Sequence, residues 1–194
     1  MSVTRIVPPA KLPVSVEEQK AFLRIAEDYT AEDAVVAACL ASATAIAEQI
    51  TGRALITQTW RATFDAFPDS ALELPRLPVQ SIASLTYAGA DGVAQTVDAA
   101  DYALVRDDWR ARIVRGYGVT WATPRAQYDA VTVTWVAGYG DDPADVPEPL
   151  RTAIMMMAAH MFENRQDVMT GPGSAVVIPQ TSQWILQLYS VPAM

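Results

Sequence analysis

The sequence has little of what most enzymes and metalloproteins use. It contains one histidine, His160, and one cysteine, Cys39, among 194 residues. Zinc and other soft-metal sites need several such ligands, so the usual sites of this kind are excluded. A catalytic triad would have to use His160, but no Gly-x-Ser-x-Gly nucleophile motif accompanies it. We therefore expect no catalytic residues, no metal and no cofactor, and interpret His160 as a helix-packing side chain and Cys39 as a small buried one.

Basic residues are also scarce. Fourteen Lys and Arg face 22 Asp and Glu, which gives a formal net charge of −8. An acidic chain does not neutralise phosphates, so sequence-specific nucleic-acid binding is not expected. The stretch 106–125 mixes arginines with aromatic residues, as single-strand binding proteins do. Aspartates are interleaved there, however, and the aromatic side chains suit the core of a hairpin.

Targeting and membrane-spanning signals are absent as well. The N-terminus lacks a basic start followed by an apolar core, so no signal peptide is predicted. The longest apolar run, around Ala153–Met161, is too short to cross a bilayer. Synthesis in the cytoplasm and no membrane association are expected. The hydrophobic share of 51% is ample for one packed domain.

Two helices are predicted before residue 52. Ser15 and Glu18 form a capping-box pattern that opens a short helix to about Glu27. Thr30 and Asp33 repeat the pattern before a longer helix to about Ile50, which Gly52 should end. The inner face of the longer helix is predicted to consist of Val35, Ala38, Cys39, Ser42, Ile46 and Ile50.

The middle of the chain changes to strand periodicity. Apolar and polar residues alternate over Ile56–Phe64, with Gln58 as the exception on the apolar side. A hairpin is predicted from Val79–Tyr87 and Val93–Val97, joined by a glycine-containing turn. Shorter strands are expected at 102–105 and 112–114, and the clearest strand at Ala130–Val136. The sequence thus predicts an antiparallel β-rich unit at about 55–137.

A helix at about 148–167 is apolar nearly all round. Either it is the central core helix, or a neighbouring subunit buries part of it. The candidates for packing between subunits are Met155, Met156 and Ala159. A glycine-rich joint then leads to an apolar C-terminal arm at about 174–194. The predicted fold class is α+β, with one domain over 1–194: N-terminal helices within about 15–51, the inserted β-rich unit, the long helix of the C-terminal half and the arm.

Several phrases, in order, resemble one protein family. They are Leu12-Pro-Val-Ser-Val-Glu-Glu-Gln-Lys20, Thr51-Gly-Arg-Ala-Leu-Ile-Thr-Gln-Thr-Trp60, Leu74-Pro-Arg-Leu-Pro-Val79, Ser84-Leu-Thr-Tyr87, Ala137-Gly-Tyr-Gly140, Val146-Pro-Glu-Pro-Leu-Arg151 and Glu163-Asn-Arg165. Over roughly residues 11–167 the chain resembles the head–tail connector (adaptor) family of long-tailed phages and gene transfer agents.

The resemblance implies a structural virion protein located in the neck of the particle. Such a protein forms a ring, usually of twelve copies, under the portal protein, and presents a surface to a stopper or tail-terminator protein. The ring joins the DNA-filled head to the tail, and DNA passes through its lumen without sequence-specific binding. After Glu163-Asn-Arg165 the sequence departs from the family pattern, because Ser190-Val-Pro-Ala-Met194 lacks the expected basic end.

The apolar arm offers candidate anchors for the portal or for a neighbouring copy, because aromatic and branched side chains dominate interface energetics. These candidates are Ile178, Trp184, Ile185, Leu188 and Tyr189. The arm could instead cover its own core. Two other functions stay open: a stopper or tail-completion protein, and a small hydrolase or carbohydrate-binding β-module.

Overall fold

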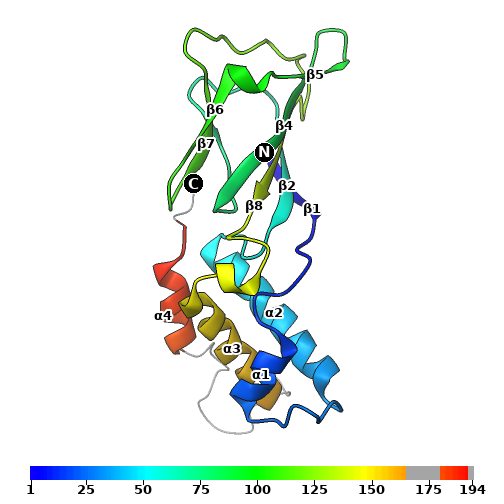
Figure 1. The fold of residues 1–194 in the computed structure, drawn as a ribbon. Helices are drawn as coiled ribbons and strands as arrows, with labels where there is room; N and C mark the ends of the chain where they lie inside the picture. The colour runs from blue at the N-terminus through cyan, green and yellow to red at the C-terminus, as the bar shows by residue number, and fades with distance from the viewer. Residues whose placement is uncertain (165–179, 192–194) are drawn as a thin grey trace, which may run out of the picture.

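The computed structural model of the protein describes residues 1–164 and 180–191. It contains an α-helical unit and a β unit, which lie end to end (Figure 1). The helices are α1 (Val16–Leu23), α2 (Asp33–Thr51), α3 (Glu148–Glu163) and α4 (Gln180–Leu188). The strands are β1 (Ser2–Val7), β2 (Gln58–Phe64), β3 (Leu72–Glu73), β4 (Val79–Ala88), β5 (Ala94–Thr96), β6 (Tyr102–Arg106), β7 (Ala111–Arg115) and β8 (Val131–Ala137). The predicted α+β class is confirmed.

The β unit consists of two antiparallel sheets. The larger has the order β1-β2-β8-β4-β5, and the smaller has the order β3-β7-β6. Strand β8 is central and alternates strictly between buried and half-buried residues, which is why its period is so clear in the sequence. Trp135 of β8 is fully buried and lies opposite Trp60 of β2. The inward-facing side chains of both sheets form one apolar core.

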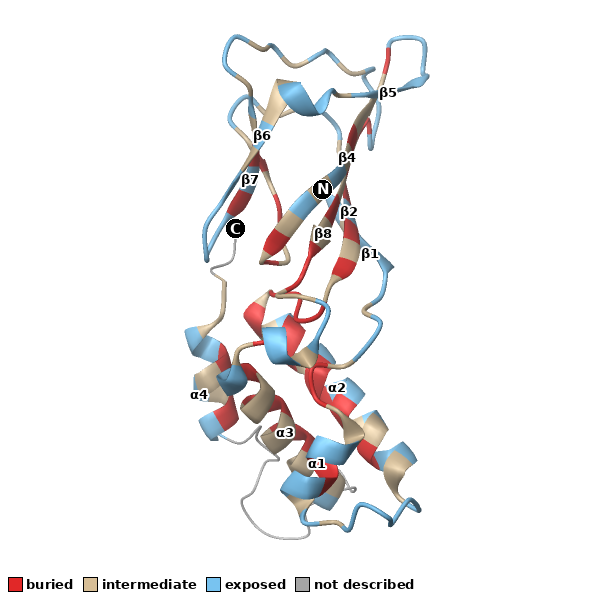
Figure 2. Ribbon diagram, in the orientation of Figure 1, coloured by how far each residue is buried: buried red, intermediate tan, exposed pale blue. Residues whose placement is uncertain are grey.

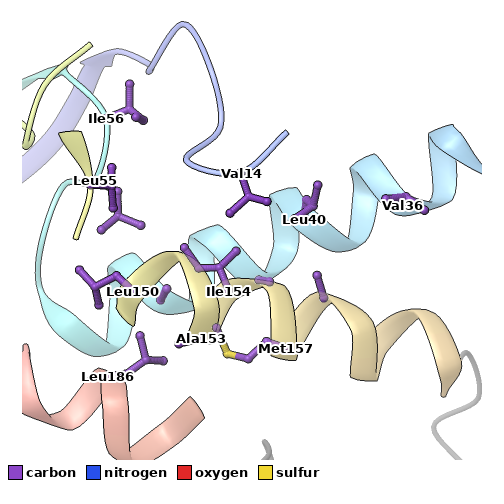
Figure 3. Packing of buried hydrophobic residues seen from close by; sticks show 14 residues of the cluster. Val14, Val36, Leu40, Leu55, Ile56, Leu150, Ala153, Ile154, Met157 and Leu186 are labelled. Atoms are coloured by element: carbon purple, nitrogen blue, oxygen red, sulfur yellow. The ribbon is translucent and has the colours of Figure 1, made fainter. Parts of the chain in front are cut away.

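The helical unit has a core of its own (Figure 3). Helix α3 lies at its centre, between α2 and α4 (Figure 3). No residue of α3 from Leu150 to Phe162 is exposed, although the helix is apolar nearly all round. Helix α3 is therefore the central core helix, and burial of its half-buried residues by a neighbouring subunit stays a prediction. Its inner residues Leu150, Ile154 and Met157 pack against Leu40 of α2 and Leu186 of α4 within this core.

The capping box of α1 is confirmed. The Glu18 amide donates to Ser15 Oγ (3.2 Å), and the Ser15 amide donates to Glu18 Oε2 (2.9 Å). The predicted extension to Glu27 is wrong, because Arg24 adopts a left-handed conformation (φ 59°) and ends the helix. The buried ammonium group of Lys20 then donates to the carbonyl oxygen of Glu27 (2.7 Å), so this segment is held as a turn.

Helix α2 begins later than predicted. Glu32, not Thr30, occupies the N-cap, and its side chain makes no cap hydrogen bond. The carboxylate of Asp33, which the predicted capping box would have used, pairs instead with Lys20 Nζ at 3.0 Å. Gly52 does end the helix in a left-handed conformation (φ 68°), as predicted.

The predicted inner face of α2 is wrong by one position. The residues that α2 buries are Val36, Leu40, Ala43, Thr44, Ala47, Glu48 and Thr51. Three residues assigned to the inner face, Val35, Ala38 and Ser42, are exposed, whereas Cys39, Ile46 and Ile50 are half-buried at its edge. The small apolar side chains that suggested a buried face thus lie largely on the surface (Figure 2).

Two strands and one helix were not predicted. Strand β1 is the edge of the larger sheet and is exposed except at the half-buried Val3, so its sequence lacks the alternation that marks a half-buried strand. Strand β3 has only two residues. The arm was predicted only as an apolar segment, and its described part forms α4. The helix predicted at about 148–167 is α3, which ends at Glu163 with Asn164 as its cap, and residues 165–167 lie outside the described residues.

Candidate assembly surfaces

The C-terminal segment joins the helical unit to the β unit. The Val191 amide donates to the carbonyl oxygen of Thr51 (2.9 Å), and Ser190 Oγ donates to that of Ile50 (3.1 Å). These carbonyl groups belong to the last turn of α2, where no partner exists within the helix. The end of the arm therefore satisfies the C-terminus of α2, 140 residues earlier in the chain.

Arg53 is the second element of this junction. It follows α2 directly and is 5% exposed. Its Nε donates to the carbonyl oxygen of Tyr189 (2.7 Å) after α4, and its Nη2 donates to that of Asp108 (2.7 Å) in the β6–β7 turn. The guanidinium also lies 5.5 Å from the centre of the Trp109 ring. One side chain thus links α2, the C-terminal arm and the smaller sheet.

A buried carboxylate holds the other side of the junction. Glu48 of α2 accepts hydrogen bonds at Oε1 from the Leu55 amide (3.0 Å) and from Gln58 Nε2 (2.7 Å). Arg5 of β1 lies 3.7 Å from the other carboxylate oxygen. Gln58 is the polar exception in the predicted alternation. It is buried because its side-chain amide supplies a hydrogen bond to the buried carboxylate of Glu48.

The start of α3 is tied to α1 by Arg151. Its guanidinium pairs with Glu18, and also donates to Glu148 (2.8 Å) and to the carbonyl oxygen of Pro13 (3.0 Å). The hydrogen bond from the Ser15 amide and the pairing with Arg151 lower the pKa of Glu18 below its ordinary value, against the opposing effect of partial burial. These contacts hold α1 and the segment before it against the start of α3.

Helix α4 has one buried face and one exposed face. Ser182 and Leu186 are fully buried against the helical core, and Ile185 and Tyr189 are half-buried at its edge. Trp184 and Leu188 point away from that core and are 63% and 74% exposed. They stand four residues apart and so share one face of the helix.

The five predicted anchors of the arm differ in their exposure. Trp184 and Leu188 are available on the surface, whereas Ile185 and Tyr189 pack against the chain's own core. Ile178 lies outside the described residues. Both alternatives for the arm hold in part, because its described helix covers the core and still presents two large apolar side chains.

The outer face of α2 is a second apolar surface, which the sequence interpretation had assigned to the inner side of the helix. No charged residue occurs between Asp33 and Glu48. The exposed residues of this stretch are Ala34, Val35, Ala38, Ala41, Ser42 and Ala45. By length and composition the helix could cross a membrane, and 39% of its most apolar window is buried in the protein. Core helices pass the same test, and the inner face of α2 does belong to the core.

The other packing candidates, Met155, Met156 and Ala159, are all half-buried on α3. Met155 packs at the edge of the helical core, and its carbonyl oxygen accepts a hydrogen bond from Gln19 Nε2 (3.2 Å). The structure therefore gives these three residues less exposed surface than the outer faces of α2 and α4. Their role between subunits stays a prediction.

The described residues contain no recognisable reaction centre. His160 Nδ1 lies 3.2 Å from the side-chain nitrogen of Asn164, and no nucleophile is hydrogen-bonded to the ring. Within residues 1–164 and 180–191, no group of three His, Cys, Asp or Glu side chains could hold a metal ion. A cavity of about 530 Å³ lies between 65–66 and 123–128 in the β unit. Tyr128 in its wall and Tyr117 in the same loop region are exposed.

Comparison with solved structures gives the fold a context. The chain is similar to one in the virion of a native gene transfer agent particle, with 25% identity and a TM-score of 0.80. A chain in the neck of an empty particle, computed with C6 symmetry, matches with 26% identity and a TM-score of 0.81. In both cases the match covers 100% of this chain and 97% of the other. The fold is that of a chain in a particle neck.

A third structure, the neck of a native gene transfer agent particle computed with C12 symmetry, shares the fold at 24% identity and a TM-score of 0.75, with the same coverage. No family model and no curated protein sequence matches the chain. The likeness to neck structures supports a location in the virion neck and a structural role.

Proposed function

We propose that the protein is a head–tail connector, or adaptor, of a phage or gene transfer agent. It forms a ring under the portal, extends the DNA channel and joins the DNA-filled head to the tail. The observation that carries this proposal is the end-to-end likeness to a neck chain, at 26% identity over 100% of this chain. A likeness that spans both the helical and the β unit concerns the whole subunit rather than one motif.

Self-association into a ring has independent support from the surface. The outer faces of α2 and α4 are uncharged, although the chain as a whole carries a net charge of −8. The face of α2 is mainly apolar, and that of α4 presents Trp184 and Leu188 beside polar uncharged side chains. Monomeric proteins rarely keep large contiguous apolar surfaces in water, so such faces mark contacts. The similar neck structures were computed with C6 and C12 symmetry, which supports a closed ring. Twelve copies is the number that the connector resemblance implies.

The partners follow from the place in the particle. The portal protein lies on the head side of the ring, and a stopper or tail-terminator protein lies on the tail side. Trp184 and Leu188 are the candidate anchors for the portal or for a neighbouring copy, since large exposed apolar side chains supply much of the energy of an interface. DNA passes through the lumen without sequence-specific binding, because a chain with a net charge of −8 does not neutralise phosphates.

The test is the removal and restoration of the gene in a producer strain, followed by electron microscopy of the released particles. The proposal predicts DNA-filled or leaking heads separated from intact free tails, with complete particles restored by the unaltered gene. Normal tailed particles from the deletion strain would overturn the proposal. Binding of the purified protein to portal rather than to tail components separates the connector from a stopper or tail-completion protein.

A further inference from the structure

Two faces of the helical unit lack a partner within the described chain, and they differ in the size of their side chains. The outer face of α4 presents Trp184 and Leu188, both large and both exposed. The outer face of α2 presents a row of small side chains, with Ala38, Ala41 and Ala45 at its centre. Helix α4 contains no charged residue, and α2 contains none between Asp33 and Glu48.

The faces are complementary in shape. Side chains three and four positions apart form ridges along a helix, and the depth of the grooves between them depends on residue size. A row of alanines leaves a shallow surface that allows close approach of another helix. A Trp and a Leu that stand one turn apart can then lie along that surface as the large partners.

The faces also point away from each other. Leu186 of α4 and Leu40, Ala43 and Ala47 of α2 point into the same core, with α3 between the two helices (Figure 3). Figure 2 shows the exposed sides of α2 and α4 at opposite sides of the helical unit. A cyclic ring needs this arrangement, because each copy uses one surface toward the preceding copy and a different surface toward the next.

We propose that Trp184 and Leu188 of one copy pack on the alanine face of α2, around Ala41, in the next copy. This inference rests on the connector function proposed above and assigns the arm face to the neighbouring copy rather than to the portal. Charge supports the assignment, since copies with a net charge of −8 repel one another except where their surfaces are uncharged. The contact is small for a stable dimer, so closure of the ring and the portal platform must supply the rest.

Cross-linking in assembled particles tests the contact. In a Cys39→Ser background, chains that carry Leu188→Cys together with Ala41→Cys are expressed in the deletion strain, and the particles are treated with a short bis-maleimide. The expected result is a ladder of dimers and larger multimers of this protein. Chains with either substitution alone should stay monomeric. Leu188→Cys with Ala94→Cys is the matched control, because Ala94 is exposed on β5 in the β unit.

The outcomes separate this inference from the proposed function. If particles contain the protein, and its thiols react with a monofunctional maleimide, but pairs of Leu188→Cys with Cys at 38, 41 or 45 give only monomers, the contact is wrong and the connector function stands. If the unaltered protein is absent from complete particles, both fail. Capture of the portal by Leu188→Cys, in place of a ladder, would reassign the arm face to the portal.

A charge exchange gives a second, independent measurement. Ala41→Glu and Leu188→Lys should each lower the yield of complete particles about tenfold or more, because each buries an unpaired charge in the contact. The double variant should recover most of the yield, because the two charges then face each other across the interface. Ala21→Glu, at an exposed position of α1, should leave the yield unchanged. Equal losses in the double and single variants would overturn the contact.

Discussion

Arg53 donates a 2.7 Å hydrogen bond from Nε to the carbonyl oxygen of Tyr189, 136 residues later in the chain. The same guanidinium donates to the carbonyl oxygen of Asp108 in the β6–β7 turn. A planar group with several fixed donors can hold two backbone carbonyls at once, which a lysine cannot do with the same geometry. Arg53 therefore fixes the C-terminal arm relative to the β unit.

Replacement of Arg53 by Met should lower the free energy of unfolding by about 2–4 kcal/mol. Two carbonyl groups lose a charged donor in a site where Arg53 itself is 5% exposed. Urea titration followed by tryptophan fluorescence measures the change. Arg110→Met, at an exposed position of the same turn, should stay within about 0.5 kcal/mol of the wild type. Equal effects of the two substitutions would show that the buried position of Arg53 contributes nothing specific.

Glu48 and Gln58 form the second contact that can be tested across the junction. Each single substitution to Ala should lower the free energy of unfolding by about 2–4 kcal/mol, because a buried polar partner is left unsatisfied. The double variant should lose less than the sum, with a coupling of about 1–3 kcal/mol from the 2.7 Å hydrogen bond between them. Additive losses in a double-mutant cycle would mean that the two side chains stabilise the fold separately.

The sequence predicted those strands in which apolar and polar residues alternate because one side of the strand is buried. Strands β8 and β4 were found within one or two residues, since each packs one side against the core. The residues of β5 are all exposed, and this strand was found from the glycine-containing turn before it. Strand β1 was missed because an exposed edge strand is specified by its hydrogen bonds to β2, which leave no apolar alternation. Helix α4 was missed because its Trp184 and Leu188 point outward, so its apolar residues do not mark a single face.

The misassigned face of α2 has a related cause. From Ala34 to Ala47 nearly every residue is small or apolar, so periodicity cannot distinguish the side that faces the core. The packing of Leu40 and Val36 against α3 decides it, and that is information about tertiary structure. A single sequence therefore shows how many apolar residues the helix has, and not which of them face the chain's own core.

The scarcity of histidine and cysteine predicts that the protein has no reaction centre, and this stays a prediction. His160 does lie on α3, as the helix pattern indicated, but Arg53 and Glu48 gave no sequence signal that separates them from surface charges. Their roles depend on backbone groups that approach from distant parts of the chain. Only the buried exception at Gln58 in the alternation of β2 pointed toward such a partner.

Glu18 predicts a pH dependence of stability. Its pKa lies below the ordinary value of 4.5 because the Ser15 amide and Arg151 favour the ionised form. The carboxylate therefore stabilises the folded state above the unfolded pKa, and the contribution is lost as the pH falls through the lower, folded pKa. Glu18→Gln should be destabilised at pH 7 by no more than about 1 kcal/mol, because the carboxylate is partly exposed.

The difference between wild type and Glu18→Gln should shrink as the pH is lowered from 5 toward 3. Urea titrations at pH 7, 5 and 3 measure it. Glu17→Gln is the matched control, since Glu17 is exposed in the same first turn and makes no contact with Arg151 among the ion pairs of the described residues. A difference that grows on acidification would contradict the pKa direction of Glu18.

Leu186 and Leu188 stand two positions apart on α4 and should separate stability from assembly. Leu186 is fully buried, so Leu186→Ala should lower the free energy of unfolding by about 2–5 kcal/mol. Leu188 is 74% exposed, so Leu188→Ala should stay within about 0.5 kcal/mol of the wild type.

In particles the prediction is different: Leu188→Ala folds normally but reduces the yield of complete particles, because it removes half of the exposed apolar pair. Thermal unfolding of the purified chains and particle counts from the complemented strain measure the two effects. A Leu188→Ala chain that is both stable and fully competent in assembly would show that the outer face of α4 carries no interface.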